Sequence, residues 1–224
     1  MASLLHLLFP PSCLICEASG LVLCTSCESR IVRVTASRDI AGTQLWAGAY
    51  YGDELAQLIL LAKEENSVLA RNYLSQLLVE SFMRATANLS QTSDVTLIPI
   101  PSSAAANRRR GFQHSYLLAR GAALRIEKFS LQNIEVNNSL RVNRRIADQS
   151  NLNRVERMRN LSDAYSVRGR HMTRLTHPTP GSIFLIDDLV TSGSSIRERL
   201  RALRQLGITP SRVLAAGVSP RVFS

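Results

Sequence analysis

Residues 183–195 read IFLIDDLVTSGSS, and this stretch decides the fold class. Residues 183–186 form a short apolar run, which is typical of a buried strand. After a loop of small hydroxyl residues, residues 194–206 are predicted to form a helix that ends before Gly207, a favourable residue for a helix C-terminus. A buried strand that leads directly into a helix is the repeating unit of α/β proteins.

The same alternation of strand and helix patterns extends along the chain. Residues 53–89 repeat apolar side chains at spacings of three and four, with a break expected at Asn66–Ser67. After the loop 102–112, a second helix is expected to reach about Arg125. Strands are predicted at 46–51, 95–100, 133–136, 164–167 and 212–218. The sequence therefore predicts an α/β fold with a parallel sheet and helices on both faces.

An acidic pair, Asp187 and Asp188, directly follows the apolar run at 183–186. In an open α/β sheet, ligands bind at the carboxyl ends of the strands. Two adjacent carboxylates at such a position can accept hydrogen bonds from vicinal hydroxyls, and they can help to hold a divalent cation. The pair is therefore a candidate binding site for a sugar.

Small residues come next, and they are suited to a phosphate. Glycine lets the backbone approach a ligand closely, and the free N–H groups at the start of a helix favour an anion. Together with the acidic pair, this loop predicts a site for a ribose 5-phosphate. The alternative is an ordinary strand, an Asp turn and a serine N-cap. The chain has neither GxxxxGK[ST] nor GxGxxG. The candidate phosphate-binding residues are Thr191, Ser192, Gly193, Ser194 and Ser195.

The four cysteines of the chain all lie near its beginning, as two CxxC pairs separated by seven residues. Each CxxC pair can form a tight turn whose two sulfurs face one metal ion, and four thiolates suit tetrahedral zinc. Disulfides and an iron–sulfur cluster are the alternatives. We therefore predict a structural zinc ion, with the ligands Cys13, Cys16, Cys24 and Cys27.

The charge is strongly positive and is carried almost entirely by arginine. The formal net charge of the 224 residues is +10, and 25 of the 27 basic residues are arginines. Arginine binds phosphates and carboxylates bidentately, so nucleotides, pyrophosphate or nucleic acid are expected partners. A solvated basic surface is the alternative. No run of 18 apolar residues occurs, and the apolar beginning lacks a basic segment, so a cytoplasmic protein without a membrane span is expected.

The segment IFLIDDLVTSGSSI resembles the phosphoribosyl-pyrophosphate motif of type I phosphoribosyltransferases. The whole chain resembles the ComF family of competence-associated, phosphoribosyltransferase-like proteins. The shared motifs are FPPSCLIC with CTSC, LIPIP, RRRGF and DQSNLNRVERMRNL. The resemblance implies a four-cysteine zinc module at 1–45 and a phosphoribosyltransferase-like domain at 46–224. It also implies binding of phosphoribosyl pyrophosphate with Mg²⁺, and a link to DNA uptake in natural transformation.

The resemblance also assigns roles to individual residues. Asp187 and Asp188 would be the catalytic pair that holds the ribose 2- and 3-hydroxyls. The implied pyrophosphate loop consists of Arg108, Arg109, Arg110 and Gly111, for which a solvated charge run is the alternative. The implied flexible loop carries Gln149, Arg157 and Asn160, for which a disordered basic linker is the alternative.

The chain departs from the family pattern at two places. Gln113 and His114 replace the amide pair that usually follows RGF, and His114 is expected to be exposed or to cap a helix rather than to act as a base. Lys63 matches a family lysine, but Glu64-Glu65-Asn66 replaces the aromatic residue and glycine that usually follow it, so Lys63 is not expected to take part in the chemistry.

The sequence is compatible with three functions. The first is a phosphoribosyltransferase whose acceptor the sequence does not identify. The second is an adaptor that binds single-stranded DNA and DNA-uptake proteins, because residues 101–175 hold 15 basic and 5 acidic residues, a net charge of +10. The third is a regulator that keeps the ligand site without turnover.

Overall fold

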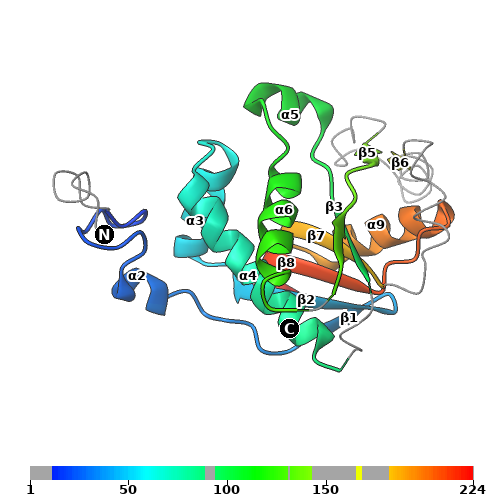
Figure 1. Ribbon diagram of the computed structural model, residues 1–224, viewed down its shortest axis with the longest axis horizontal. Coiled ribbons are helices and arrows are strands. Elements are labelled where there is room, and N and C mark those ends of the chain that lie inside the picture. The colour runs from blue at the N-terminus through cyan, green and yellow to red at the C-terminus, as the bar shows by residue number, and fades with distance from the viewer. Residues whose placement is uncertain (1–11, 89–93, 131, 143–164, 168–181, 224) are drawn as a thin grey trace.

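A six-stranded sheet forms the centre of the molecule, in a computed structural model that describes residues 12–88, 94–130, 132–142, 165–167 and 182–223 (Figure 1). β1 pairs antiparallel with β2, and every other neighbouring pair is parallel. The mostly parallel sheet confirms the predicted α/β class. In sheet order the strands are β1 (Arg38–Ile40), β2 (Thr43–Tyr50), β8 (Arg212–Val218), β7 (Ser182–Val190), β3 (Val95–Pro99) and β4 (Ile134–Val136).

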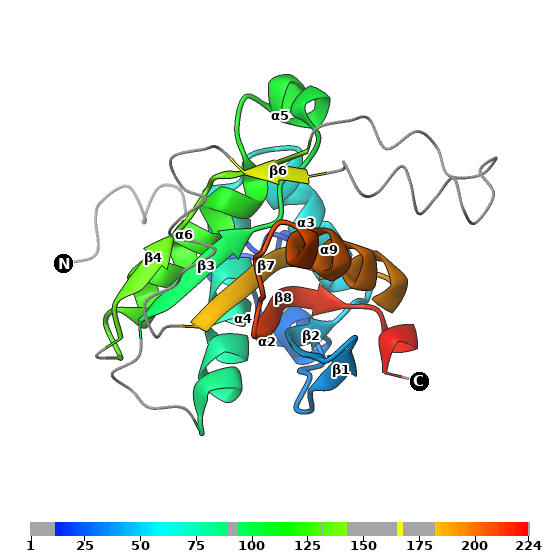
Figure 2. The ribbon, with the colours of Figure 1, turned by 90° about the vertical axis from the view of Figure 1, so that its right-hand side faces the viewer.

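Helices cover both faces of this sheet (Figures 1 and 2). One face carries α3 (Asp53–Lys63), α4 (Val68–Thr86) and α6 (His114–Ile126), and the other carries α9 (Gly193–Gln205). Within the described ranges, no helix is both long and apolar enough to cross a membrane. Parallel strands flanked by helices are buried on both faces, which explains why β7 and β8 are apolar without alternation.

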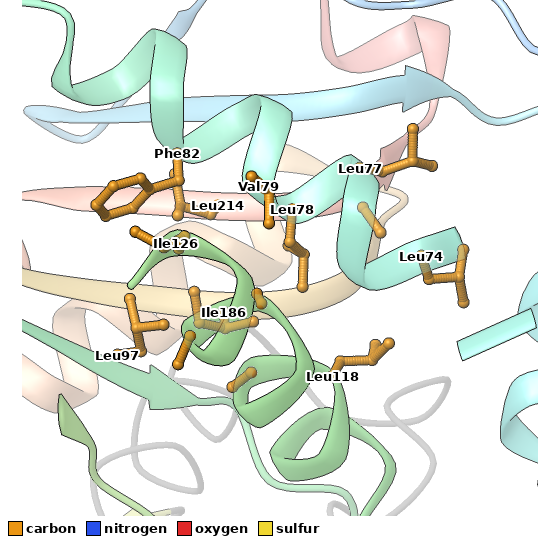
Figure 3. Packing of buried hydrophobic residues seen from close by; sticks show 14 of the residues in the cluster. Leu74, Leu77, Leu78, Val79, Phe82, Leu97, Leu118, Ile126, Ile186 and Leu214 are labelled. Carbon is orange, nitrogen blue, oxygen red and sulfur yellow. The ribbon is translucent and has the colours of Figure 1, made fainter. Parts of the chain in front are cut away.

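Two hydrophobic clusters correspond to the two faces. Figure 3 shows the first, where α4 and α6 pack over β3, β7 and β8 through side chains that include Phe82, Leu118, Leu97, Ile186 and Leu214. The strand residues between these point to the opposite face and pack under α9. Because successive side chains on a strand alternate between faces, neighbouring residues of β7 contribute to different clusters.

The helical region 53–89 divides as expected. α3 ends at Lys63 and α4 starts at Val68. Asn66 has a positive φ of 56°, which interrupts the helix, and the Ser67 hydroxyl accepts a hydrogen bond from the Ala70 N–H at 3.3 Å. The predicted break at Asn66–Ser67 is therefore confirmed, and a serine N-cap is its physical cause.

The expected loop at 102–112 contains a short helix, α5 (Ala104–Arg110), which corrects the prediction. The Ser103 hydroxyl accepts a hydrogen bond from the Ala106 N–H at 3.2 Å, and Gly111 ends the helix with a φ of +76°. Three alanines between a serine N-cap and a glycine favour a helix, and this signal was present in the sequence.

β7 is longer than the predicted strand and includes Asp187 and Asp188, so the acidic pair does not follow the strand but lies within it. Pairing with β3 stops at Ile186, opposite Pro99, while pairing with β8 continues to Val190. The pair therefore lies beyond the end of β3. A strand boundary of this kind depends on the neighbouring strand, which the local sequence does not reveal.

The remaining elements are small. β5 (Leu140–Val142) and β6 (Tyr165–Val167) form a separate antiparallel pair. The cysteine-bearing segment contains α2 (Thr25–Ser29), and η3 (Pro220–Val222) follows β8. β1 and the first residues of β2 precede residue 45, the expected domain boundary, yet they belong to the six-stranded sheet. Gly207, with a φ of +75°, ends α9 as predicted.

Gly48 on β2 provides a direct test of this packing. A Cβ atom at Gly48 would lie 2.6 Å from the Leu77 Cβ and 2.8 Å from the Leu77 carbonyl oxygen on α4. Since backbone atoms cannot move aside cheaply, we expect Gly48→Ala to lower the free energy of unfolding by about 3 kcal/mol. Urea unfolding measures this loss. Gly52→Ala is the control, because a Cβ there meets nothing within 4 Å, and an equal loss in both variants would contradict the explanation.

Candidate functional site

The acidic pair forms the centre of the candidate site, at the carboxyl end of β7. Asp187 and Asp188 are 5% and 6% exposed, which is rare for carboxylates without partners. Each carboxylate accepts the backbone N–H that follows it, at 3.0 Å from the Asp188 N–H to Asp187 and at 2.9 Å from the Leu189 N–H to Asp188. These bonds turn both side chains toward the carboxyl end of the strand.

The two aspartates have different cationic partners, because they point to opposite faces of the sheet. Arg199 of α9 donates to Asp187 Oδ2 at 2.6 Å on one face. Lys63 of α3 donates to Asp188 Oδ2 at 2.9 Å on the other face, where His114 Nε2 lies 3.5 Å from the same oxygen. The site therefore joins both helical layers at the end of one central strand.

These different environments give the two carboxyl groups different pKa values. Burial raises the pKa of Asp187 to about 7, although Arg199 opposes the shift. Burial also disfavours the ionised form of Asp188, but Lys63 and His114 outweigh it and hold the pKa of Asp188 below its ordinary value. Asp188 is thus ionised at neutral pH, whereas the pKa of Asp187 is close to neutral pH, so Asp187 is only partly ionised there.

Lys63 is not expected from the sequence to take part in the chemistry, yet its amine forms an ion pair with Asp188 at 2.9 Å. It is the last residue of α3, a position that lies 125 residues from Asp188 in the chain. Its match to a family lysine was the only signal in the sequence. That match was weakened because the residues after Lys63 are Glu64, Glu65 and Asn66, which differ from the family pattern.

His114 is buried and does not have the exposed or capping role expected for it. It is the first residue of α6 and is 1% exposed, and neither ring nitrogen has a hydrogen-bond partner among the described residues. Burial lowers the pKa of His114 to about 4, so its ring is neutral at neutral pH. A neutral imidazole beside Asp188 keeps one N–H available to a carboxylate or a ligand.

His114 should make the protein sensitive to acid. The folded-state pKa is below the unfolded value of about 6.5, so the unfolded chain binds more protons and stability falls as the pH drops from 6.5 toward 4. For this one group we expect a loss of about 2 kcal/mol between pH 7 and pH 5. His114→Asn should lose less stability over that interval, as measured by urea unfolding at both pH values. Equal losses in both proteins would contradict the assignment.

The loop after the acidic pair leads into α9, which begins at Gly193. Thr191 is exposed, and Ser192 and Gly193 are half-buried. A Cβ at Gly193 would meet only the Ile40 Cδ1, at 3.7 Å, so packing within the protein does not require a glycine there. Ser194 and Ser195 belong to the first turn of α9, close to the helix start predicted at residue 194.

The three arginines of the implied pyrophosphate loop lie on α5 and differ in their environment. Arg109 and Arg110 both bind Glu64, with Nη2-to-carboxylate distances of 2.9 and 2.7 Å. The Arg110 side chain is 8% exposed and that of Arg109 is 70% exposed. Arg108 is exposed and has no hydrogen bond or ion pair with the described residues. Arg110 holds the pKa of Glu64 below its ordinary value.

The end of α3 connects the arginines to the acidic pair. Lys63 binds Asp188, and the next residue, Glu64, binds Arg109 and Arg110. Figure 1 shows α3 and α5 extending past the sheet on the same side. One short helix end therefore sets the position of both groups of charges.

The four cysteines come together as a candidate metal centre. Their sulfur atoms all lie within 4.8 Å of one another, and the Cys16 and Cys24 sulfurs are 3.6 Å apart. A tetrahedral zinc site with Zn–S bonds of about 2.3 Å places its sulfurs about 3.8 Å apart, so the cluster fits structural zinc. The Cys24 N–H and the Arg30 guanidinium donate to the sulfurs of Cys13 and Cys27, at 3.4 and 3.3 Å.

This centre is attached to α3. Gln57 donates to the carbonyl oxygens of Leu14 and Ile15 at 3.4 and 3.5 Å, and Arg30 forms an ion pair with Glu54. The side chains of Leu14, Ile15 and Leu23 pack against the first hydrophobic cluster. The cysteine module therefore supports the helix that carries Lys63.

Gln149, Arg157 and Asn160, the residues of the implied flexible loop, lie outside the described residues. Comparison of the chain with protein-family models gives no match, and comparison with curated proteins gives none either.

Proposed function

We propose that this protein binds phosphoribosyl pyrophosphate together with Mg²⁺, as a phosphoribosyltransferase-like protein of the ComF type. The observation that carries the proposal is the buried acidic pair at the carboxyl end of β7, which is followed within a few residues by the start of α9. Buried carboxylates suit sugar hydroxyls, and a helix start suits a phosphate. Together they match a ribose 5-phosphate.

In this proposal each charged group has a separate task. Asp187 and Asp188 accept hydrogen bonds from the ribose 2- and 3-hydroxyls, and the backbone from Thr191 to Ser195 holds the 5-phosphate. Arg108 is exposed on α5 and is free to bind the pyrophosphate. Lys63 and Arg199 keep the acidic pair oriented when no sugar is bound.

The two aspartates and their cationic partners also affect how Mg²⁺ would bind. Mg²⁺ is usually held by one or two carboxylates, waters and the phosphates of the substrate. Because Lys63 and Arg199 already offset the charge of the aspartates, the ion would arrive with the pyrophosphate and be held largely by it. When bound, Mg²⁺ would neutralise charge on the departing pyrophosphate.

A ComF-type protein would act in the cytoplasm, in DNA uptake during natural transformation or in DNA use. Transfer of the phosphoribosyl group to an acceptor would be a second step that follows ligand binding. A regulator that binds without turnover would show binding but no release of pyrophosphate with any acceptor.

Titration calorimetry tests the binding step. Phosphoribosyl pyrophosphate with Mg²⁺ should bind with one site per chain, and ribose 5-phosphate should bind more weakly because it lacks the pyrophosphate. Since the hydroxyls need an ionised Asp187, affinity should fall as the pH drops below 7. No heat of binding at any pH between 6 and 8 would refute the proposal.

Glu64 should compete with the pyrophosphate, because its carboxylate occupies two arginines of α5. We expect Glu64→Gln to raise the affinity for inorganic pyrophosphate about threefold, a modest effect because the ion pairs are partly exposed. Calorimetry measures the change. Glu65→Gln is the matched control, since Glu65 is exposed and adjacent. An equal rise in both variants would show a general charge effect instead.

A second candidate function is that of an adaptor that binds single-stranded DNA and DNA-uptake proteins. The observation that favours it is the exposure of Arg108 and Arg109 on α5, which projects beyond the sheet (Figure 1). Such binding would weaken steeply with salt. Retention of labelled single strands across salt concentrations tests it. Loss in Arg108→Ala/Arg109→Ala but not in Asp187→Asn/Asp188→Asn would support it, and equal retention in all proteins would refute it.

A further inference from the structure

An open surface cavity, separate from the acidic pair, lies along α9 beside the turn between β1 and β2. Its volume is about 460 Å³, and it is lined by Ala41, Arg197, Glu198, Arg201, Arg204 and Gln205. Cavities that hold small organic ligands have volumes of about 300–1,000 Å³. β1 is an edge strand of the sheet, and Arg204 of α9 contacts the turn that follows it.

Three of the lining residues form a basic stripe. Arg197, Arg201 and Arg204 have the spacing i, i+4, i+7, which places them on one face of α9 over roughly 10 Å of helix. Arg199 lies on a different face of the helix and binds Asp187. The stripe therefore takes no part in holding the acidic pair.

Two of these arginines have unused hydrogen-bonding capacity. Arg197 has no hydrogen bond or ion pair with the part of the chain that the structure describes. Arg201 donates from Nε to Glu198 at 3.0 Å, but its Nη2 is buried without a partner among the described residues. A buried donor without an acceptor is unfavourable, and an anionic ligand that reached it would remove this cost.

The third arginine builds the wall of the cavity. Arg204 donates from Nη2 to the Ala41 carbonyl at 2.8 Å and to the Thr43 hydroxyl at 2.9 Å. Ala41 has a φ of +55°, a conformation that a residue with a side chain adopts only at a cost. Arg204 thus helps to fix a strained turn next to the two arginines that have free donors.

The chemistry of the lining selects the ligand. With three arginines and one glutamate, the lining has a formal charge of +2. Guanidinium groups bind phosphates bidentately and stack on aromatic rings, and the volume exceeds that of an inorganic ion. We propose that this cavity binds a small organic polyphosphate with an aromatic base, that is, a nucleoside triphosphate. This site does not depend on phosphoribosyl pyrophosphate binding at the acidic pair.

The test is calorimetric titration of the full chain with adenosine triphosphate, without added divalent cation. We expect Arg197→Ala and Arg201→Ala each to weaken binding about tenfold, as for loss of a charged hydrogen bond. Glu198→Gln keeps an acceptor for Arg201 but removes a repelling charge, so it should strengthen binding about threefold. Arg120→Ala, which removes an exposed arginine from α6, should leave affinity unchanged.

The outcomes separate this site from the acidic pair. Binding that survives in Asp187→Asn/Asp188→Asn and weakens in the α9 variants supports the proposal. Four results would overturn it: no binding by the unaltered protein, equal loss in Arg120→Ala, loss in the aspartate variant, or equal affinity for adenosine. Thermal unfolding of each variant identifies any that fails to fold, and Glu198→Gln still tests the proposal in that case because a gain of affinity requires a folded site.

Discussion

Replacement of Asp187 and Asp188 by asparagine should weaken binding of phosphoribosyl pyrophosphate at least about 100-fold, because two charged hydrogen bonds of about 1.5–3 kcal/mol each are lost. Asparagine keeps the size of aspartate but also presents N–H groups to the ribose hydroxyls, which need acceptors. Titration calorimetry with Mg²⁺ measures the loss. Asp94→Asn is the control, since Asp94 is an exposed acid at the start of β3.

Asparagine at position 187 should weaken ligand binding without lowering the stability of the protein. Burial raises the pKa of Asp187 to about 7, so the folded protein loses stability as the pH rises from the ordinary carboxyl pKa toward 7, and at pH 8 it holds a fully ionised buried carboxylate. Asp187→Asn should therefore unfold at the same or a higher urea concentration at pH 8. Loss of binding without loss of stability assigns a role in ligand binding. A variant that binds normally, or one that loses binding only because it unfolds, would contradict that assignment.

Removal of zinc should unfold the cysteine module while the sheet persists. Structural zinc contributes about 10–16 kcal/mol of apparent binding free energy in zinc-finger peptides, and the segment around the cysteines has little core of its own. We expect one zinc per chain in the unaltered protein and almost none in Cys27→Ser. Amide exchange should become fast at residues 12–30 and remain slow in β7 and β8, which are buried.

Two controls make the zinc experiment decisive. Ser29→Ala alters an exposed residue of α2 whose hydroxyl donates to the Ser26 carbonyl, so this variant should keep its zinc. A chelator should reproduce the effect of Cys27→Ser. If zinc were absent from purified protein, or if its removal left exchange at residues 12–30 unchanged, the structural role would be refuted.

The sequence determined the features that depend on neighbouring residues. The break at Asn66–Ser67 follows from a serine N-cap, the end of α9 follows from Gly207, and the cysteine cluster follows from two CxxC turns. Alternating strand and helix patterns were enough to predict the α/β class. In each case the controlling interactions are local, so the spacing of residue types along the chain already contains them.

Only the tertiary structure determined which groups surround the acidic pair. Lys63 and His114 lie 125 and 74 residues before Asp188, and neither was expected at the site. Whether Asp187 and Asp188 lie in a strand depended on where β3 stops and β8 continues. Partners, burial and acidity are set by chain segments that meet only after folding. The sequence by itself determined where the acids are, and the tertiary structure decided which cations hold them.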